Sequence, residues 1–225
     1  MFGDSASTTG IPSEVWRYYL LVNRPEISDT KFQWHDLAAK NNDELLKNLG
    51  NLTNRVLTFL KKFNNEVPKV DRTKLQDFDF KFLKKVRELT QEYHKKLEYV
   101  KIKDGLKIVM EISGEGNLYM QEVEPWVVFK TDPTTCGYYM NILVNVIRLL
   151  GCLAEPYMPS FSAKLYEILN IKYDDKNSLL LKEIINNNFE FILTLVEEGH
   201  KINDPLPLFK EIPDESTKEF KSKFG

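Results

Sequence analysis

The sequence has few of the residue types from which metal centres and reactive sites are built. Its 225 residues include two cysteines, Cys136 and Cys152, and three histidines. The cysteines do not form a C-x-x-C pair, and no histidine or other cysteine stands at metal-ligand spacing from either of them. We therefore predict two buried free thiols and no zinc site.

Several catalytic motifs are absent as well. The sequence contains no G-x-x-x-x-G-K-[ST] and no G-x-G-x-x-G, so neither of the usual glycine-rich phosphate loops is present, and it contains no G-x-S-x-G element. We interpret His35, His94 and His200 as packed or solvated side chains rather than general bases. The carboxylates are numerous, but their spacing singles out no acid–base pair. We predict no catalytic residue, no metal and no cofactor within this chain.

Long apolar runs and a strong net charge are also missing. No uninterrupted apolar run reaches the roughly 18 residues that cross a bilayer, and the first ten residues lack the basic and apolar regions of a secretion signal. The formal net charge of −2 argues against a protein that coats nucleic acid through bulk electrostatics. We expect a cytoplasmic protein that contacts neither a membrane nor DNA.

The charge is unevenly distributed along the chain. Residues 61–107 contain 14 Lys and Arg against 8 Asp and Glu, a net of +6, so the remaining residues carry −8. This region could form a basic surface that contacts phosphates, or it could be the solvated face of ordinary helices. The sequence leaves both interpretations open.

Hydrophobic periodicity predicts a chain made mainly of helices joined by short turns. The predicted helices cover residues 13–22, 36–63, 77–100, 106–123, 125–131, 136–155, 158–169 and 179–198. Within the last of these, FEFILTLV could instead be extended. The helix at 136–155 is almost wholly apolar, so we expect it to be central. Together these elements predict an all-α bundle of ordinary size.

A small mixed α/β segment is expected in front of the bundle. The alternation in TKFQW predicts a strand at 30–34, and Asp36 is the predicted N-cap of the long helix that follows. Asp104 and Gly105 predict a turn, and residues 199–214, with three prolines, should be irregular. We divide the chain into a connecting module at 1–35, the bundle at 36–200 and a tail at 201–225 that packs back on the bundle.

One face of the helix at 36–63 carries polar side chains beside its apolar stripe. Asn48, Asn51 and Arg55 fall within about 60° of one another on a helical wheel, at the border of the stripe formed by Leu45, Leu49, Leu52 and Val56. Asparagine offers donors and an acceptor, and arginine offers five donors. They could match the edge of an unpaired base. Alternatively, Asn51 caps or bridges to a neighbouring helix and Arg55 is solvated.

Trp126 is the second candidate for contact with a base. Pro125 halts the preceding helix, and the break projects Trp126 at a new angle. Stacking of a base on an aromatic ring contributes about 1–3 kcal/mol. The alternative is a core tryptophan at a helix junction.

At these residues the chain resembles the methionyl-tRNA synthetases, in their eukaryotic cytosolic form. GIPSEVWRYYLLVNRPEISDTKFQWHDLAAKNNDELLKNLGNLTNR is similar to the segment after the family's KMSKS-type catalytic loop. EPWVVFK resembles the family's P-W element, and GHKI with PLF resembles the segment that ends its catalytic core. The resemblance runs from about residue 2 to the C-terminus.

The resemblance implies a stem-contact module followed by the anticodon-binding bundle of a class I aminoacyl-tRNA synthetase. The implied partners are methionine tRNA, through its CAU anticodon loop, and a catalytic domain that is missing from this chain and uses ATP with Mg. The other function that we consider is a helical scaffold that binds protein partners and no nucleic acid.

The resemblance also implies roles for individual residues. Asn51 and Arg55 match the helix pair that hydrogen-bonds the first anticodon base, a cytosine, and Trp126 matches the residue on which an anticodon base stacks, with Pro125 shaping its position. Asn48 and Phe209 are secondary candidates. Many relatives carry a basic residue two positions after the aromatic residue of PLF, where this sequence has Glu211. The contribution of the tail therefore stays open.

Overall fold

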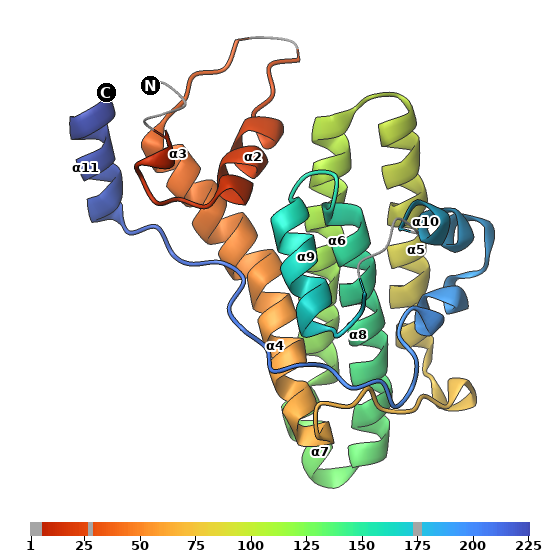
Figure 1. Cartoon of the computed structure of the whole chain (residues 1–225). Coiled ribbons are helices and arrows are strands. Elements are labelled where there is room, and N and C mark those ends of the chain that lie inside the picture. The colour runs from red at the N-terminus through yellow and green to blue at the C-terminus, as the bar shows by residue number, and fades with distance from the viewer. Residues whose placement is uncertain (1–5, 27–28, 173–176) are drawn as a thin grey trace.

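The computed structural model describes residues 6–26, 29–172 and 177–225, and within them the chain is built from helices (Figure 1). The elements are α2 (Ser13–Val22), α3 (Trp34–Ala39), the π-helical segment η1 (Lys40–Gly50), α4 (Asn51–Phe59), the 3₁₀ segments η2 (Leu60–Phe63) and η3 (Arg72–Lys74), α5 (Asp77–Glu98), α6 (Ile102–Val123), α7 (Pro125–Thr131), α8 (Pro133–Ala154), α9 (Pro159–Ile168), α10 (Asn177–Asn186), the 3₁₀ segment η4 (Phe189–Thr194) and α11 (Asp214–Phe224).

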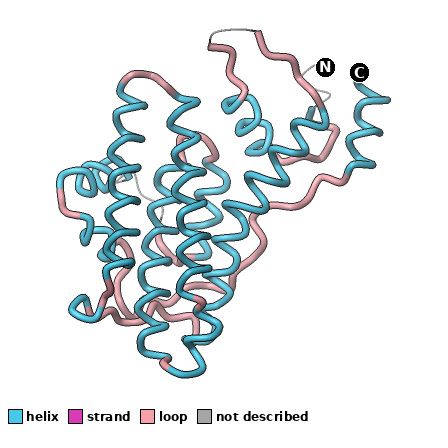
Figure 2. Tube along the Cα trace, turned by 180° about the vertical axis from the view of Figure 1, so that it is seen from behind, coloured by secondary structure: helices cyan, strands magenta, loops and turns pink. Residues whose placement is uncertain are grey.

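The predicted strand at TKFQW is wrong, and with it the mixed α/β segment. Phe32 and Gln33 lie in an irregular stretch, and the described residues contain helix and loop but no strand (Figure 2). Among the residues that the structure describes, no extended segment pairs with this stretch in a hydrogen-bonded ladder. The aromatic side chains instead form a cluster, in which the ring centroid of Phe32 lies 5.7 Å from that of Trp16 and 4.9 Å from that of Trp34. The described chain is all-α.

A single helical run extends from Trp34 to Phe63 through α3, η1, α4 and η2. It begins two residues before the predicted N-cap, because Gln33 has the extended backbone of a cap residue. The carboxylate of Asp36 instead accepts a hydrogen bond of 3.1 Å from Asn23. The predicted apolar stripe is confirmed, since Leu45, Leu49, Leu52 and Val56 are fully buried.

The middle of this run takes the wider π-helical form over residues 40–50. Gly50 ends it at a point where the C-terminal tail crosses the helix. A Cβ atom on Gly50 would lie 3.0 Å from the carbonyl oxygen of Leu45 and 3.1 Å from the ring of Phe209. The glycine thus permits the close approach of the tail.

Helix α8 is central, as predicted from its composition. It packs against α4, α6, α7, α9 and η4, and the side chain of Asp132 caps its start by accepting a hydrogen bond of 3.0 Å from the backbone of Thr135. The length and composition of α8 would also suit a membrane span. However, 94% of its most apolar 18-residue stretch is buried inside the bundle. Its apolar side chains therefore pack against protein.

Both cysteines are free and buried, as predicted. Burial raises the pKa of the Cys136 and Cys152 thiols to about 11. They therefore behave as small core side chains rather than as nucleophiles.

The predicted turn at Asp104–Gly105 is wrong, because both residues belong to the first turn of α6. The chain reverses earlier, at residues 99–101, where Val100 adopts a positive φ of 58°. A Cβ atom on Gly105 would lie 2.4 Å from the hydroxyl oxygen of Tyr157, which donates to the carbonyl of Ile102. The glycine here permits close packing between α6 and Tyr157.

The C-terminal third differs from prediction in two places. The predicted helix at 179–198 ends at Asn186, and FEFILT forms the 3₁₀ segment η4, which is neither of the two expected conformations. Residues 173–176, which precede the predicted helix, lie outside the part of the chain that the structure describes. After the irregular, proline-containing stretch, α11 forms a helix that the sequence analysis did not predict. Its Phe220 and Phe224 rings lie 5.1 and 5.9 Å from Trp34.

The molecule has two distinct ends. Helices α2, α3 and α11 and the C-terminus gather at one end, and α7 with the last turns of α4 forms the other (Figure 1). The long helices α5, α6 and α8 run between the two ends. Any group carried by α4 and α7 is therefore far from the N-terminal segment.

Candidate nucleic-acid interface

The polar face predicted on the long helix lies where η1 and α4 meet α6. Asn48 donates a hydrogen bond of 2.9 Å from Nδ2 to the carbonyl of Met110. Asn51 donates one of 2.9 Å from Nδ2 to Oδ1 of Asn117. The two helices are thus joined by side-chain amides, and Asn51 makes the bridge to a neighbouring helix that was one of its predicted roles.

The direction of these amides is fixed by backbone groups. The Nδ2 group of Asn117 donates to the carbonyl oxygens of Asn48 and Ser113, at 3.1 Å each, and to Oδ1 of Asn48 at 3.1 Å. Because carbonyls only accept, Oδ1 of Asn117 must face Asn51. Asn51 therefore turns its NH₂ toward Asn117, and within the described part of the chain its own Oδ1 has no donor.

Arg55 lies one turn further along α4, and its guanidinium carbon is 5.4 Å from the ring centroid of Trp126 on α7. Both side chains are half-buried. This is a cation–π contact, and it brings together two of the residues proposed from the sequence.

The joint between α6 and α7 sets the position of Trp126. Glu124 is the single residue between the two helices, and it has a positive φ of 39°. Pro125 follows as the first residue of α7 and is buried, and its carbonyl accepts a hydrogen bond of 3.4 Å from the thiol of Cys136 on α8. The break predicted at Pro125 is therefore a sharp, anchored bend.

Aromatic packing holds α7 against the end of the long helical run. The ring of Phe129 lies 6.0 Å from Phe59 and 5.3 Å from Phe63, with both pairs edge to face. Since Phe129 is three residues from Trp126, these contacts fix the helix that carries the indole. The site thus stands on packed helices rather than on a loop.

Phe209 is not part of this arrangement. It is buried, its ring stacks on Phe161 at 5.3 Å, and it lies against Gly50. It is a core residue that the tail contributes to the bundle. The structure thus joins Asn48 and Asn51 through Asn117 and places Arg55 on Trp126, while Phe209 packs elsewhere.

Sequence analysis missed Asn117, which links the two asparagines of the long helix. It lies 66 residues from Asn51, so no local pattern connects them. The one available signal was a poor helix former in the interior of a helix rich in apolar residues.

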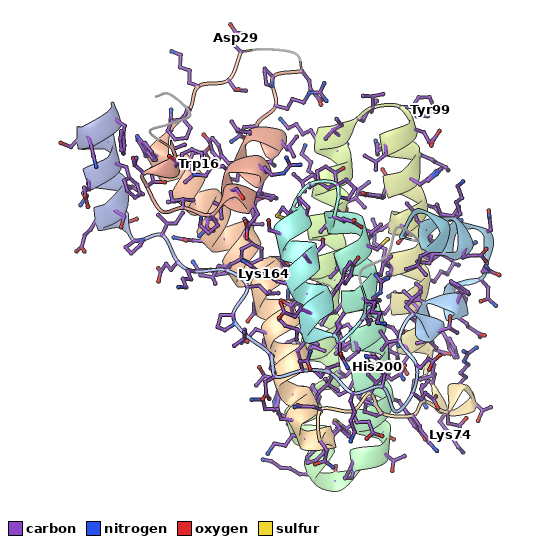
Figure 3. All side chains as sticks on the ribbon, in the orientation of Figure 1. Trp16, Asp29, Lys74, Tyr99, Lys164 and His200 are labelled. Carbon is purple, nitrogen blue, oxygen red and sulfur yellow. The ribbon has the colours of Figure 1, made fainter. Side chains whose placement is uncertain are left out.

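The basic region at 61–107 is largely a solvated face that contains ion pairs. Arg72 lies 3.8 Å from Glu190 and Lys85 lies 3.2 Å from Glu111. Lys74 projects from the lower end of the molecule (Figure 3). The positive charge is therefore spread over the bundle and partly offset.

The histidines lie apart from the amide and indole groups. Nε2 of His200 is 2.6 Å from the carbonyl of Leu169, His94 is 3.7 Å from Glu98, and His35 is exposed. Among the described residues no group of three His, Cys, Asp or Glu side chains could hold a metal ion.

Two family models match the chain. One described as "Anticodon binding domain of methionyl tRNA ligase" matches residues 67–225, and one described as "tRNA synthetases class I (M)" matches residues 2–57. The second match ends inside the helical run that carries Asn51 and Arg55.

Curated relatives match over the whole chain. A probable methionine–tRNA ligase of Oryza sativa subsp. japonica is 43% identical and a probable cytoplasmic one of Dictyostelium discoideum is 44% identical, each with 29% of its length covered. The cytoplasmic methionine–tRNA ligase of Homo sapiens is 38% identical, with 24% of its length covered. The chain therefore spans less than a third of these relatives.

A solved structure has the same fold. The apo crystal structure of Mycobacterium tuberculosis methionyl-tRNA synthetase matches 92% of this chain and 40% of its own, with a TM-score of 0.79 and 20% identity. Taken with the match at residues 67–225 and the identity of 38–44% to the three ligases, this chain belongs to the methionyl-tRNA ligase family and contains its anticodon-binding domain.

Proposed function

We propose that this chain binds methionine tRNA and reads the first base of its CAU anticodon, a cytosine, with Asn51, Arg55 and Trp126. The observation that carries the proposal is the arrangement of donors and acceptors at the junction of α4, α6 and α7. Loop bases are recognised after they unstack, through their edges and through stacking on aromatic rings.

The polar groups complement cytosine. Its Watson–Crick edge presents one amino donor beside two acceptors. The Oδ1 atom of Asn51 is left as an acceptor by the link to Asn117, and Arg55 supplies several donors in a planar fork. Uracil presents an acceptor where cytosine has its amino donor, so the same groups would meet it with a mismatch.

Trp126 supplies the stacking surface, which Arg55 covers in the unbound chain. A base that stacks on the indole must displace the guanidinium, which then becomes available for the base edge. The lost cation–π contact is worth about 0.5–2 kcal/mol for a half-buried pair. The stacking gained is worth about 1–3 kcal/mol, and the guanidinium gains hydrogen bonds to the base edge, so the exchange favours the bound base.

The remaining proposals concern the whole protein. We assign residues 1–35 to a stem-contact module, 36–200 to the anticodon-binding bundle, and 201–225 to a tail. A catalytic domain outside this chain would use ATP, with Mg, to load methionine on the tRNA, in the cytoplasm. The placement of the N-terminal segment and the junction of α4 with α7 at opposite ends of the bundle supports this division (Figure 1).

The test is a titration of the whole chain with anticodon stem–loop RNAs of methionine tRNA. We expect a change of the first anticodon base from cytosine to uracil to weaken binding by about 1–3 kcal/mol. Trp126→Ala should weaken binding of the cytosine RNA by about 1–3 kcal/mol. Arg55→Gln should reduce the preference for cytosine more than the overall affinity. Fluorescence anisotropy gives each affinity.

Arg72→Gln is the matched control, because it removes an exposed arginine away from Trp126. It should lower the affinity for both RNAs alike and leave the preference unchanged. Circular dichroism checks that Trp126→Ala keeps its helices. Equal affinity of the wild-type chain for both RNAs would contradict the proposal and favour a protein-binding scaffold.

A further inference from the structure

The C-terminal tail crosses the long helical run at the π-helical segment η1, and we call residues 206–213 of the tail the strap (Figure 1). Phe209 of the strap is buried against Gly50, the last residue of η1. Ile212 of the strap is buried as well, and its backbone lies beside Asn42, near the start of η1. The strap therefore contacts η1 near both of its ends.

Two consecutive asparagines of η1 bind the backbone of the strap. Asn42 donates from Nδ2 to the carbonyl of Ile212 at 2.9 Å, and its Oδ1 accepts from the N–H of Ile212, also at 2.9 Å. Asn41 is buried and donates to the carbonyl of Lys210 at 2.8 Å and to Oδ1 of Asn42 at 2.9 Å. The Asn42 amide thus pairs with both polar backbone groups of one residue, as a partner strand does in an antiparallel sheet.

The strap has few other attachments. Within the described part of the chain, its backbone is otherwise hydrogen-bonded only through Pro213, whose carbonyl accepts from the N–H of Thr217 in α11. Two open cavities of about 440 and 500 Å³ adjoin the strap, and Pro207 and Leu208 line both of them. The position of the strap on η1 therefore depends on its two buried side chains and on the two asparagines.

The segment under the strap has a helical form that needs outside support. π-helices are rare, and an unusual backbone persists where surrounding contacts fix it. The buried side chains of η1 include Asn41, Leu45 and Leu49, which recur at every fourth residue. In an α-helix the third of these would be turned about 80° away from the face of the first. The wider turns of η1 therefore set the rotation of α4 relative to α3.

We infer that Asn42 is a positioning residue for base reading, because it fixes the strap on η1 and so holds η1 in the form that directs Asn51 and Arg55 toward the RNA. Asn51 directly follows η1, and Arg55 lies one turn further along α4. The contact that carries the inference joins positions 170 residues apart, Asn42 and Ile212. The inference rests on the proposed function and extends it to residues that do not touch the base.

Asn42→Ala removes both hydrogen bonds to Ile212 and tests the inference by titration with the cytosine and uracil stem–loop RNAs. The preference for cytosine should fall by about fivefold, because the base-reading groups lose their fixed direction. Asn42→Asp is a second variant of the same size, which keeps the acceptor and loses the NH₂ donor. It should lower the preference in the same direction. Asn42 is half-buried, so both variants should keep their helices, which circular dichroism checks.

Asn203→Ala is the matched control. The side chain of Asn203 also ties the tail to the bundle, since it donates to the carbonyl of Glu167 at 2.7 Å, but it lies before the strap and does not contact η1. This variant should lower the melting temperature about as much as Asn42→Ala, since each loses amide–backbone hydrogen bonds. It should leave the preference for cytosine unchanged.

Hydrogen exchange gives a measurement that needs no RNA. In Asn42→Ala the backbone amides of residues 44–50 should exchange faster than in the wild type, because the support of η1 is weakened. The amides of α8, which the strap does not hold, should exchange at the wild-type rate. In Asn203→Ala the amides of residues 44–50 should also keep the wild-type rate.

The outcomes separate this inference from the proposed function. If the wild type prefers cytosine and Asn42→Ala keeps that preference in full, the inference is overturned and the proposed function stands. If the wild type binds both RNAs equally, both are overturned. Unchanged exchange over residues 44–50 in Asn42→Ala would also overturn the inference. So would an equal loss of preference in Asn203→Ala, which would show that general stability and not the strap on η1 determines base reading.

Discussion

At the scale of single residues, the amides of Asn48, Asn117 and Asn51 form a chain with a direction. Two backbone carbonyls accept hydrogen bonds from the NH₂ of Asn117, so the Oδ1 atom of Asn117 faces Asn51. Asn51 donates to that oxygen from its own NH₂, which leaves Oδ1 of Asn51 as the acceptor for a base. An asparagine alone could present either end to a base. Under the proposed function, selectivity would therefore depend on Asn117, a residue that need not touch the RNA.

Asn117→Ala should test this dependence. Without its partner, the amide of Asn51 can rotate and offer its NH₂ to uracil, so the preference for cytosine over uracil should fall by about tenfold. Affinity for the cytosine RNA should fall less. Asn54→Ala is the control, since Asn54 is exposed on the same helix. An unchanged preference in Asn117→Ala would show that Asn51 is oriented by something else.

At the scale of elements, the end of α5 carries a strained residue. Val100 has a φ of 58° and is 65% exposed. Its N–H bonds to the carbonyl of Leu97, and the N–H of Lys101 bonds to that of Lys96 at 2.8 Å, which is the pattern that usually ends in glycine. A β-branched side chain is costly in this conformation.

Val100→Gly should therefore stabilise the chain. Relief of strain contributes about 1–2 kcal/mol, and the greater freedom of glycine in the unfolded chain removes about 0.5–1 kcal/mol of it. The net gain of about 1 kcal/mol should raise the melting temperature by roughly 2–4 °C. Tyr99→Gly, at a neighbouring exposed position with negative φ, should not stabilise. A melting temperature for Val100→Gly below that of the wild type would contradict this account.

The elements also explain what sequence could predict. Helices α2, α5 and α8 follow from their own apolar periodicity, because the stripe that makes each helix is contained within it. Helix α11 has few apolar residues, so its own sequence gives little helical periodicity. Its Phe220 and Phe224 pack against Trp34, which is almost the whole chain away in sequence. The strand at TKFQW failed for the same reason, since alternation predicts a strand only where a partner strand exists.

The candidate site, too, could be predicted only in part from the sequence. Asn51, Arg55, Pro125 and Trp126 could be named from local breaks in helical pattern and from family resemblance. Their arrangement could not, because it depends on contacts between α4, α6 and α7. The link through Asn117 joins positions 66 residues apart, and a helical wheel contains no such information.

At the scale of the whole molecule, the two ends are joined by rigid elements. The helical run from Trp34 to Arg55 spans about 30 Å at 1.5 Å per residue. Helix α2 is fixed to the bundle by Arg17, whose guanidinium donates to the carbonyls of Tyr157 at 2.8 Å and Pro156 at 3.2 Å. Under the proposed function, a rod of this kind would keep the anticodon at a constant distance from the N-terminal segment.

The packing of α11 on Trp34 should be separable from RNA binding, because about 30 Å of helix lies between Trp34 and Arg55. Phe220→Ala with Phe224→Ala removes the two rings that cover the indole. We expect a red shift of tryptophan emission and faster proteolysis of residues 214–225. Affinity for the cytosine stem–loop should stay within about twofold, which corresponds to less than 0.5 kcal/mol.

Lys218→Ala with Lys221→Ala is the control for this last prediction, because both lysines are exposed on the same helix. It should leave emission and proteolysis unchanged. If the double phenylalanine variant loses RNA affinity in step with its change in emission, the rod does not isolate the ends from each other. The N-terminal cluster would then influence the base-reading groups through α3, η1 and α4, and the bundle would have to be described as a coupled unit rather than a spacer.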